Sequence, residues 1–106
     1  MGLFSNLFGK RKRIILEALE RDAKIIDVRT PQEFRMGNVD GSVNIPLDKL
    51  NSTTIKKIKK LNRPVLLCCA SGTRSASAMY TLRSSGVDDV HNGGSWHKVF
   101  RVMQSA

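Results

Sequence analysis

The sequence predicts an α/β domain with a mainly parallel sheet of four or five strands and helices on both faces. First, short apolar runs alternate along the chain with segments whose apolar residues recur at helical spacing. Second, the run Pro64–Cys69 is apolar throughout, which is typical of a parallel strand covered on both faces. The 106 residues match the commonest size of a single domain. One hydrophobic core is therefore expected.

The first third of the chain predicts a helix, a strand and a second helix with a defined start. Apolar residues at helical spacing predict a helix over residues 13–21. The β-branched run at residues 24–28 predicts a buried strand that ends before Pro31. Thr30 fits the N-cap of the next helix, with Pro31 at its first position and Glu33 completing a capping box.

The rest of the chain continues the alternation of strands and helices. The elements expected are a short strand at 42–45, a helix at 53–61, a strand at 64–69, a helix at 74–84, a strand at 87–91 and a helix from residue 95. Gly93 and Gly94, after the last strand, are interpreted as a tight turn beside the loop at residues 71–73. Met79 and Tyr80 are assigned to the buried face of the helix at 74–84.

Residues 1–13 are interpreted as an amphipathic basic extension, and residues 14–106 as the domain. The extension places apolar residues before the basic run Lys10–Arg13, which is the reverse of a secretory signal. Its helically spaced apolar residues suit contact with an anionic membrane surface. Packing against the chain's own domain is favoured over that contact, because amphipathic stripes usually face a core. The apolar residues of the stripe are Leu3, Phe4, Leu7 and Phe8.

The formal net charge of +9 indicates attraction to anions. It comes mainly from Lys10–Arg13 and from the lysine-rich segment 56–63. A basic excess can indicate nucleic-acid binding, but these runs lack interleaved aromatic residues and a binding motif. No nucleic-acid partner is therefore expected, and the field favours a small anionic substrate.

The two cysteines, Cys68 and Cys69, are adjacent in the sequence. Neighbouring strand residues point to opposite faces, so a disulfide between them would strain the backbone. Without a disulfide framework, a reducing, cytoplasmic location is expected. His91 and His97 have no acidic or cysteine partners at ligand spacing, so neither a metal nor another cofactor is expected.

The segment that carries chemistry follows the central strand. In a parallel sheet, ligands bind beyond the carboxyl ends of the strands. A short loop that enters a helix there directs consecutive N–H groups at one point and forms an anion cradle. Cys69 at the base of that cradle is expected to have a lowered pKa because of the helix dipole and Arg74. The residues expected to hold the substrate are Ala70, Ser71, Gly72, Thr73, Arg74 and Ser75.

Neighbouring residues allow structural interpretations as well. Cys69 itself would be an ordinary core residue if the loop did not form, since free cysteines are often buried. Cys68 is interpreted as core filling, with a role as a resolving thiol for an oxidised Cys69 as the alternative. Asp27, Arg29 and Glu33 resemble acid–base machinery, but an ion pair and a helix cap are the favoured roles.

Four motifs in order resemble the single-domain rhodanese family, over about residues 14 to 104. They are Ile26-Asp27-Val28-Arg29 with Pro31, Glu33 and Phe34; Gly37-x-x-x-Gly41-Ser42-x-Asn44-Ile45-Pro46; Cys69-x-x-Gly72-x-Arg74-Ser75; and Asn92-Gly93-Gly94-x-Trp96. One departure is Asn38, where the family often has histidine. Because that position belongs to a turn, the departure concerns local packing more than activity.

The resemblance implies a rhodanese-like fold and a thiosulfate sulfurtransferase activity. Cys69 would take the sulfane sulfur of thiosulfate or a persulfide and pass it to cyanide or a thiol acceptor. Two other functions stay open: a sulfur-relay or regulatory module with a protein acceptor, and a cysteine-dependent phosphatase or arsenate reductase. The last is less favoured, because those enzymes have five residues between cysteine and arginine, and this chain has four.

Overall fold

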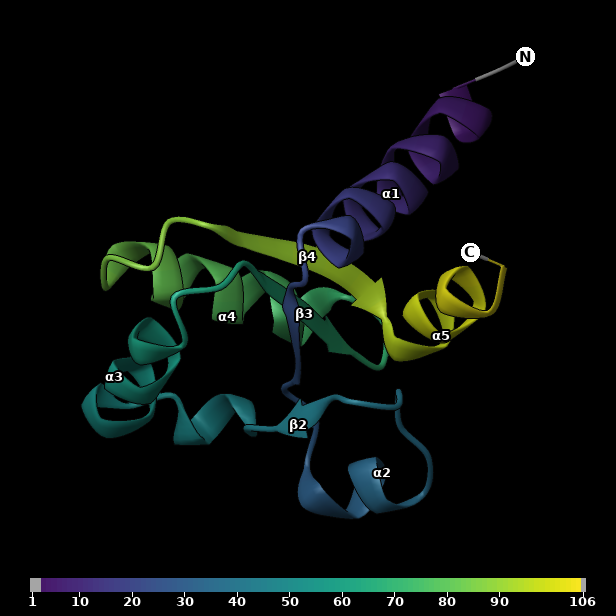
Figure 1. Ribbon diagram of the computed structural model, residues 1–106. Coiled ribbons are helices and arrows are strands. Elements are labelled where there is room, and N and C mark those ends of the chain that lie inside the picture. The colour runs from purple at the N-terminus through teal and green to yellow at the C-terminus, as the bar shows by residue number, and fades with distance from the viewer. Residues whose placement is uncertain (1–2, 106) are drawn as a thin grey trace.

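The computed structural model describes residues 3–105, which form a four-stranded sheet with helices on both faces (Figure 1). The strands are β1 (Lys24–Asp27), β2 (Val43–Asn44), β3 (Val65–Cys69) and β4 (Val90–Ser95). The helices are α1 (Leu3–Glu20), α2 (Pro31–Arg35), α3 (Ser52–Leu61), α4 (Thr73–Ser84) and α5 (Trp96–Ser105), with a 3-10 turn η1 (Leu47–Lys49). The predicted α/β class is confirmed.

The strand order places the carboxyl end of β3 between the ends of two neighbouring strands. The order is β2-β1-β3-β4, and every pair of neighbours is parallel. The prediction of four or five mainly parallel strands is thus met with four. Because β3 lies between β1 and β4, its carboxyl end at Cys69 is flanked by the carboxyl ends of both neighbours. Segments after all three strands meet there.

The sheet has a buried core on each face because its central strands β1 and β3 carry apolar residues on both sides. One core lies under α3 and α4 and includes Ile26, Val28, Ile55, Ile58, Val65, Leu67, Cys69, Ala78, Leu82, Val87 and Val90. The other lies under α1 and α5 and includes Ile15, Ala18, Ala23, Ile25, Val39, Leu66, Cys68, Val99 and Val102. The alternation of β3 therefore sends Cys68 and Cys69 into different cores, as predicted.

The last strand differs from its prediction. It occupies Val90–Ser95 instead of 87–91, so Gly93 and Gly94 lie within β4 and not in a turn after it. A Cβ added at Gly93 would lie 2.9 Å from the carbonyl oxygen of Leu67 and 2.9 Å from a methyl group of Val99. The glycine is therefore required by close packing of β4 on β3 and α5.

Tyr80 was assigned wrongly to a buried helix face. Its side chain is 76% exposed on α4, whereas Met79 is partly buried against the core under α3 and α4. The apolar positions of α4 that are fully buried are Ala78 and Leu82. The helical period therefore placed Met79 correctly and Tyr80 wrongly.

The N-terminal helix runs without a break from Leu3 to Glu20, across the boundary expected after residue 13. Its second half packs Ile15 and Ala18 into the core under α1 and α5. Met1 and Gly2, and the side chains of the apolar stripe at residues 3–8, lie outside the described part. The division into extension and domain stays a prediction. No helix among residues 3–105 is long and apolar enough to cross a membrane.

Candidate active site

The loop after β3 joins the central strand to α4 through three residues. Gly72 is the N-cap of α4 and has a φ of 101°, in the left-handed region that favours glycine. A Cβ at this position would lie 3.3 Å from the Cα atom of Gly94 in β4. Glycine thus satisfies both the backbone angle and the narrow space between the loop and the neighbouring strand. The loop is held tightly over the end of β3.

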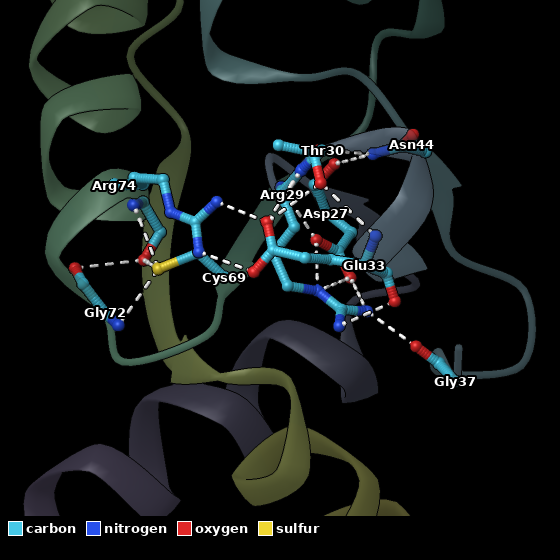
Figure 2. A network of polar contacts seen from close by, with 10 residues as sticks. Asp27, Arg29, Thr30, Glu33, Gly37, Asn44, Cys69, Gly72 and Arg74 are labelled. Carbon is cyan, nitrogen blue, oxygen red and sulfur yellow. Dashed lines mark hydrogen bonds and ion pairs between the residues drawn. The ribbon is translucent and has the colours of Figure 1, made fainter. Parts of the chain in front are cut away.

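The sulfur of Cys69 is the centre of this loop (Figure 2). Its Sγ atom accepts a hydrogen bond from the N–H of Gly72 at 2.9 Å and from the N–H of Ser75 at 3.4 Å. The hydroxyl oxygen of Ser75 lies 3.4 Å from the same sulfur. Cys69 and Ser75 have no exposed surface. The predicted amide cradle is therefore present, and it closes around the sulfur itself.

Hydrogen bonding outweighs burial in setting the acidity of Cys69. Burial is the largest influence and by itself raises the pKa of the thiol. The Ser75 hydroxyl and the N–H groups of Ser75, Gly72 and Ser71 oppose it by stabilising the thiolate, and the net pKa is lowered. The neighbouring Cys68 has a raised pKa, mainly because of burial and then because of the charge on Asp27. The two adjacent thiols therefore differ in acidity, and the lowered pKa favours the thiolate form only at Cys69.

Arg74 was predicted to hold the substrate, and the structure pairs it with Glu33 of α2. Arg74 Nη1 donates to Glu33 Oε1 at 2.6 Å, and Nη2 donates to Oε2 at 2.9 Å. The thiolate of Cys69 is also among the charges that raise the pKa of Arg74. Figure 2 shows the guanidinium extending from α4 toward the Glu33 carboxylate. Arg74 is therefore close enough to interact electrostatically with the Cys69 thiolate. Its Nη1 and Nη2 atoms are both engaged by Glu33.

Glu33 performs its predicted capping role and a second role that the sequence did not reveal. Its Oε1 accepts from the N–H of Thr30 at 3.0 Å, and Thr30 Oγ1 accepts from the N–H of Glu33, which completes the capping box. The hydrogen bonds from Arg74 and then from Thr30 lower the pKa of Glu33 to about 2. The cap thus fixes a charged carboxylate against the guanidinium of Arg74.

A buried ion pair beneath α2 supports this arrangement. Arg29 donates to both carboxylate oxygens of Asp27, with the shortest distance 2.7 Å, and its guanidinium also donates to the carbonyl of Gly37 at 2.6 Å. The same guanidinium lies 4.8 Å from the ring centroid of Trp96. Asp27 is fully buried and Arg29 nearly so. The predicted structural ion pair is confirmed, and it anchors the chain on either side of Glu33.

Asn92 is a site residue to which the sequence assigned no role. Its Oδ1 accepts from the Ser75 hydroxyl at 2.7 Å and from the N–H of Gly94 at 2.8 Å. Its Nδ2 donates to the carbonyl oxygen of Gly72 at 3.2 Å. The side-chain amide of Asn92 therefore holds two residues of the cradle, Gly72 and Ser75. Arg11 of α1 in turn donates to the carbonyl oxygen of Asn92.

The remaining predicted residues have smaller roles in the described geometry. Ser71 contributes its N–H to the lowered pKa of Cys69, and its hydroxyl lies 3.4 Å from that of Thr73. Ala70 and Thr73 complete the turn into α4. Among residues 3–105, no cluster of three or more histidine, cysteine or acidic side chains has the arrangement of a metal site.

Comparison with known proteins identifies relatives that share this region. The chain is 40% identical over 72 residues to the uncharacterized protein YqhL of Bacillus subtilis, covering 68% of this chain and 56% of that protein. It is 32% identical over 69 residues to the thiosulfate sulfurtransferase PspE of Escherichia coli, covering 65% of this chain and 66% of that enzyme. The chain thus spans less than two thirds of the length of either relative.

A solved structure and a family model agree with these relatives. A rhodanese with anions from E. coli superposes with a TM-score of 0.65 at 29% identity, covering 72% of this chain and 89% of that one. The model of the rhodanese-like domain matches residues 13–99, which include β1, the cradle and β4. The resemblance seen in the four sequence motifs is confirmed, and the chain belongs to the rhodanese-like domain family.

Proposed function

We propose that the chain is a sulfurtransferase that carries a sulfane sulfur on Cys69 between thiosulfate or a persulfide donor and cyanide or a thiol acceptor. The observation that carries the proposal is the ring of N–H donors from Gly72 and Ser75 around the Cys69 sulfur. Such donors stabilise negative charge on sulfur, both in the free thiolate and in a persulfide. Relatives named thiosulfate sulfurtransferase support the same chemistry.

The transfer consists of two displacements at sulfur. The thiolate of Cys69 attacks the outer sulfur of thiosulfate, a new S–S bond forms, and the old S–S bond breaks with its electron pair leaving on sulfite. Cyanide then attacks the outer sulfur of the Cys69 persulfide, and thiocyanate departs while the thiolate is restored. No oxidant or reductant is consumed, because each S–S bond that breaks is replaced by one new bond to sulfur.

Access to the sulfur requires movement of the cradle. Cys69 has no exposed surface in the structure, so a donor reaches Sγ only after the loop or the Arg74 side chain moves aside. Arg74 is the partly exposed cation of the site, since its side chain is 34% exposed and its guanidinium pairs with Glu33. Its guanidinium is proposed to follow the anionic donor, together with N–H groups of residues 70–75.

The free thiols support the proposed cellular location, and the net charge supports a protein as sulfur acceptor. Both cysteines are free, which suits the reducing, cytoplasmic location expected from the sequence. The net charge of +9 favours an acidic protein as the sulfur acceptor in a relay, which is the second candidate function. A relay enzyme would exchange sulfur with such a protein faster than with cyanide. The short Cys-x4-Arg loop disfavours a phosphatase.

Intact-mass measurement after mixing with thiosulfate tests the proposal. The native chain is expected to gain one sulfur atom, and cyanide should then remove it as thiocyanate. Cys69→Ser should gain none, whereas the matched control Cys68→Ser should load and unload normally. An unchanged mass of the native chain with every sulfur donor, or hydrolysis of an aryl phosphate by it, would contradict the assignment.

A further inference from the structure

The arginine of the cradle is already engaged by a carboxylate. Arg74 donates two of its five N–H groups to the two oxygens of Glu33, in the side-by-side geometry with which guanidinium binds planar anions. Glu33 in turn is fixed by the capping hydrogen bonds of Thr30. A sulfur donor that approaches Cys69 therefore meets an arginine whose charge is compensated from a rigid position.

The charges around the sulfur show what this compensation does. Glu33 and Arg74 form one neutral pair, and Asp27 with Arg29 forms a second beside it. Cys69 adds a negative charge when it is a thiolate. Each unit of negative charge on the donor is repelled by Glu33, so a dianion is penalised more than a monoanion. Arg11 is a further cation near the loop, and it donates to the backbone of Asn92.

We propose that Glu33 is a specificity-determining residue that selects monoanionic sulfur donors, such as a thiosulfonate or an alkyl persulfide, over the dianion thiosulfate. The proposal rests on the sulfurtransferase function proposed above. Glu33 acts through Arg74 and does not touch the reacting sulfur, so it tunes the potential at the cradle and takes no part in the displacement. The backbone N–H of Thr30 holds the carboxylate there, which makes the tuning part of the fold.

The substitution Glu33→Gln separates charge from shape. Glutamine keeps the length of the side chain and still serves in a capping box, but it has no negative charge. With thiosulfate and benzenethiosulfonate as donors, we expect kcat/KM for thiosulfate to rise about tenfold relative to benzenethiosulfonate, through a lower KM. The effect should shrink at high salt because part of the pair is exposed.

The matched control is Thr30→Ala, which removes the side-chain half of the cap and leaves every charge in place. The donor ratio, which is kcat/KM for thiosulfate divided by kcat/KM for benzenethiosulfonate, should equal that of the native chain in this variant. If Glu33→Gln leaves the donor ratio unchanged, or lowers both rates equally, Glu33 only holds Arg74 in position and the specificity proposal is wrong. A donor ratio that changes equally in Thr30→Ala would assign the effect to the helix cap and also overturn it.

Alkylation provides a readout that does not depend on sulfur transfer. In a Cys68→Ser background, Cys69 is treated with iodoacetate, an anion, and with the neutral iodoacetamide. The rate of alkylation by iodoacetate divided by the rate with iodoacetamide should rise about fivefold in Glu33→Gln. If the native chain transfers no sulfur but this ratio rises, the proposed function fails while Glu33 keeps its electrostatic role. If transfer occurs and the alkylation ratio is unchanged, the inference about Glu33 fails alone.

Discussion

Cys68 and Cys69 are consecutive residues of β3, yet their sulfur atoms lie in opposite chemical surroundings. The sulfur of Cys68 faces the core under α1 and α5, among apolar side chains and near the charge of Asp27. That of Cys69 lies on the other face, where Gly72 and Ser75 supply hydrogen-bond donors. Both residues are fully buried. The comparison shows that burial by itself raises the pKa of a cysteine, and that donors at the start of the next helix outweigh this effect.

The largest difference between the two sulfur atoms is expected in their reaction with iodoacetamide under native conditions. Cys69, studied in the Cys68→Ser variant, should react at least about 100-fold faster than Cys68, studied in Cys69→Ser, because only its pKa is lowered. Mass spectrometry at intervals measures both rates. Denaturant should make the rates similar. Equal rates in the folded proteins would remove the distinction between the two faces.

A change to the amide ring should weaken Cys69 without touching its side chain. Gly72→Ala forces a left-handed φ on alanine and presses its Cβ against Gly94, so the N–H that donates to the sulfur is displaced. We expect the rate of sulfur loading from thiosulfate to fall about 100-fold, as for loss of one oxyanion donor.

Gly41→Ala is the matched control for backbone strain. Gly41 also has a positive φ, of 81°, but a Cβ there would meet nothing within 4 Å. It should therefore lower the free energy of unfolding by about 1 kcal/mol and leave sulfur loading unchanged. Equal loading rates in the two glycine variants would show that the Gly72 amide is not needed.

The smallest of the three effects concerns the hydroxyl of Ser75. The Ser75 hydroxyl oxygen lies 3.4 Å from the Cys69 sulfur and lowers the pKa of the thiol, so Ser75→Ala should raise the pKa of Cys69. In a Cys68→Ser background, the midpoint of the pH profile of alkylation should move to higher pH, and the rate below that midpoint should fall about tenfold. Ser42→Ala, whose hydroxyl donates to the carbonyl of Val39, is the control. A fixed midpoint would assign the low pKa to the amides alone.

Local chemistry made several features readable from the sequence. The capping box of Thr30 and Glu33 spans four residues, and its propensity rules apply without knowledge of the rest of the chain. The opposite directions of Cys68 and Cys69 follow from the period of a strand. Predicting that Cys69 lies at the junction of β3 and α4 required only the recognition of one strand, one glycine-containing loop and one helix.

The features that were missed depend on close contact between distant segments. Gly93 was interpreted as a turn residue because glycine usually marks turns, whereas here it gives β4 room against Leu67 and Val99. Asn92 was part of a recognised motif, but its hydrogen bonds to Ser75 and Gly72 form only because β4 lies beside the cradle in the folded chain. Tyr80 was misplaced because a helical period does not say which residues a neighbour covers.

The sequence by itself determined the parallel α/β fold, the joint between β3 and α4 and the position of Cys69 at that joint, because each follows from local propensity and from the period of apolar residues. Tertiary structure decided which charged groups surround the thiol of Cys69. Glu33 and Arg74 are separated by 41 positions in the chain, and their pairing exists because β1 and β3 are neighbours and end at the same edge of the sheet. Long-range electrostatics follow strand order, which no local pattern of residues encodes.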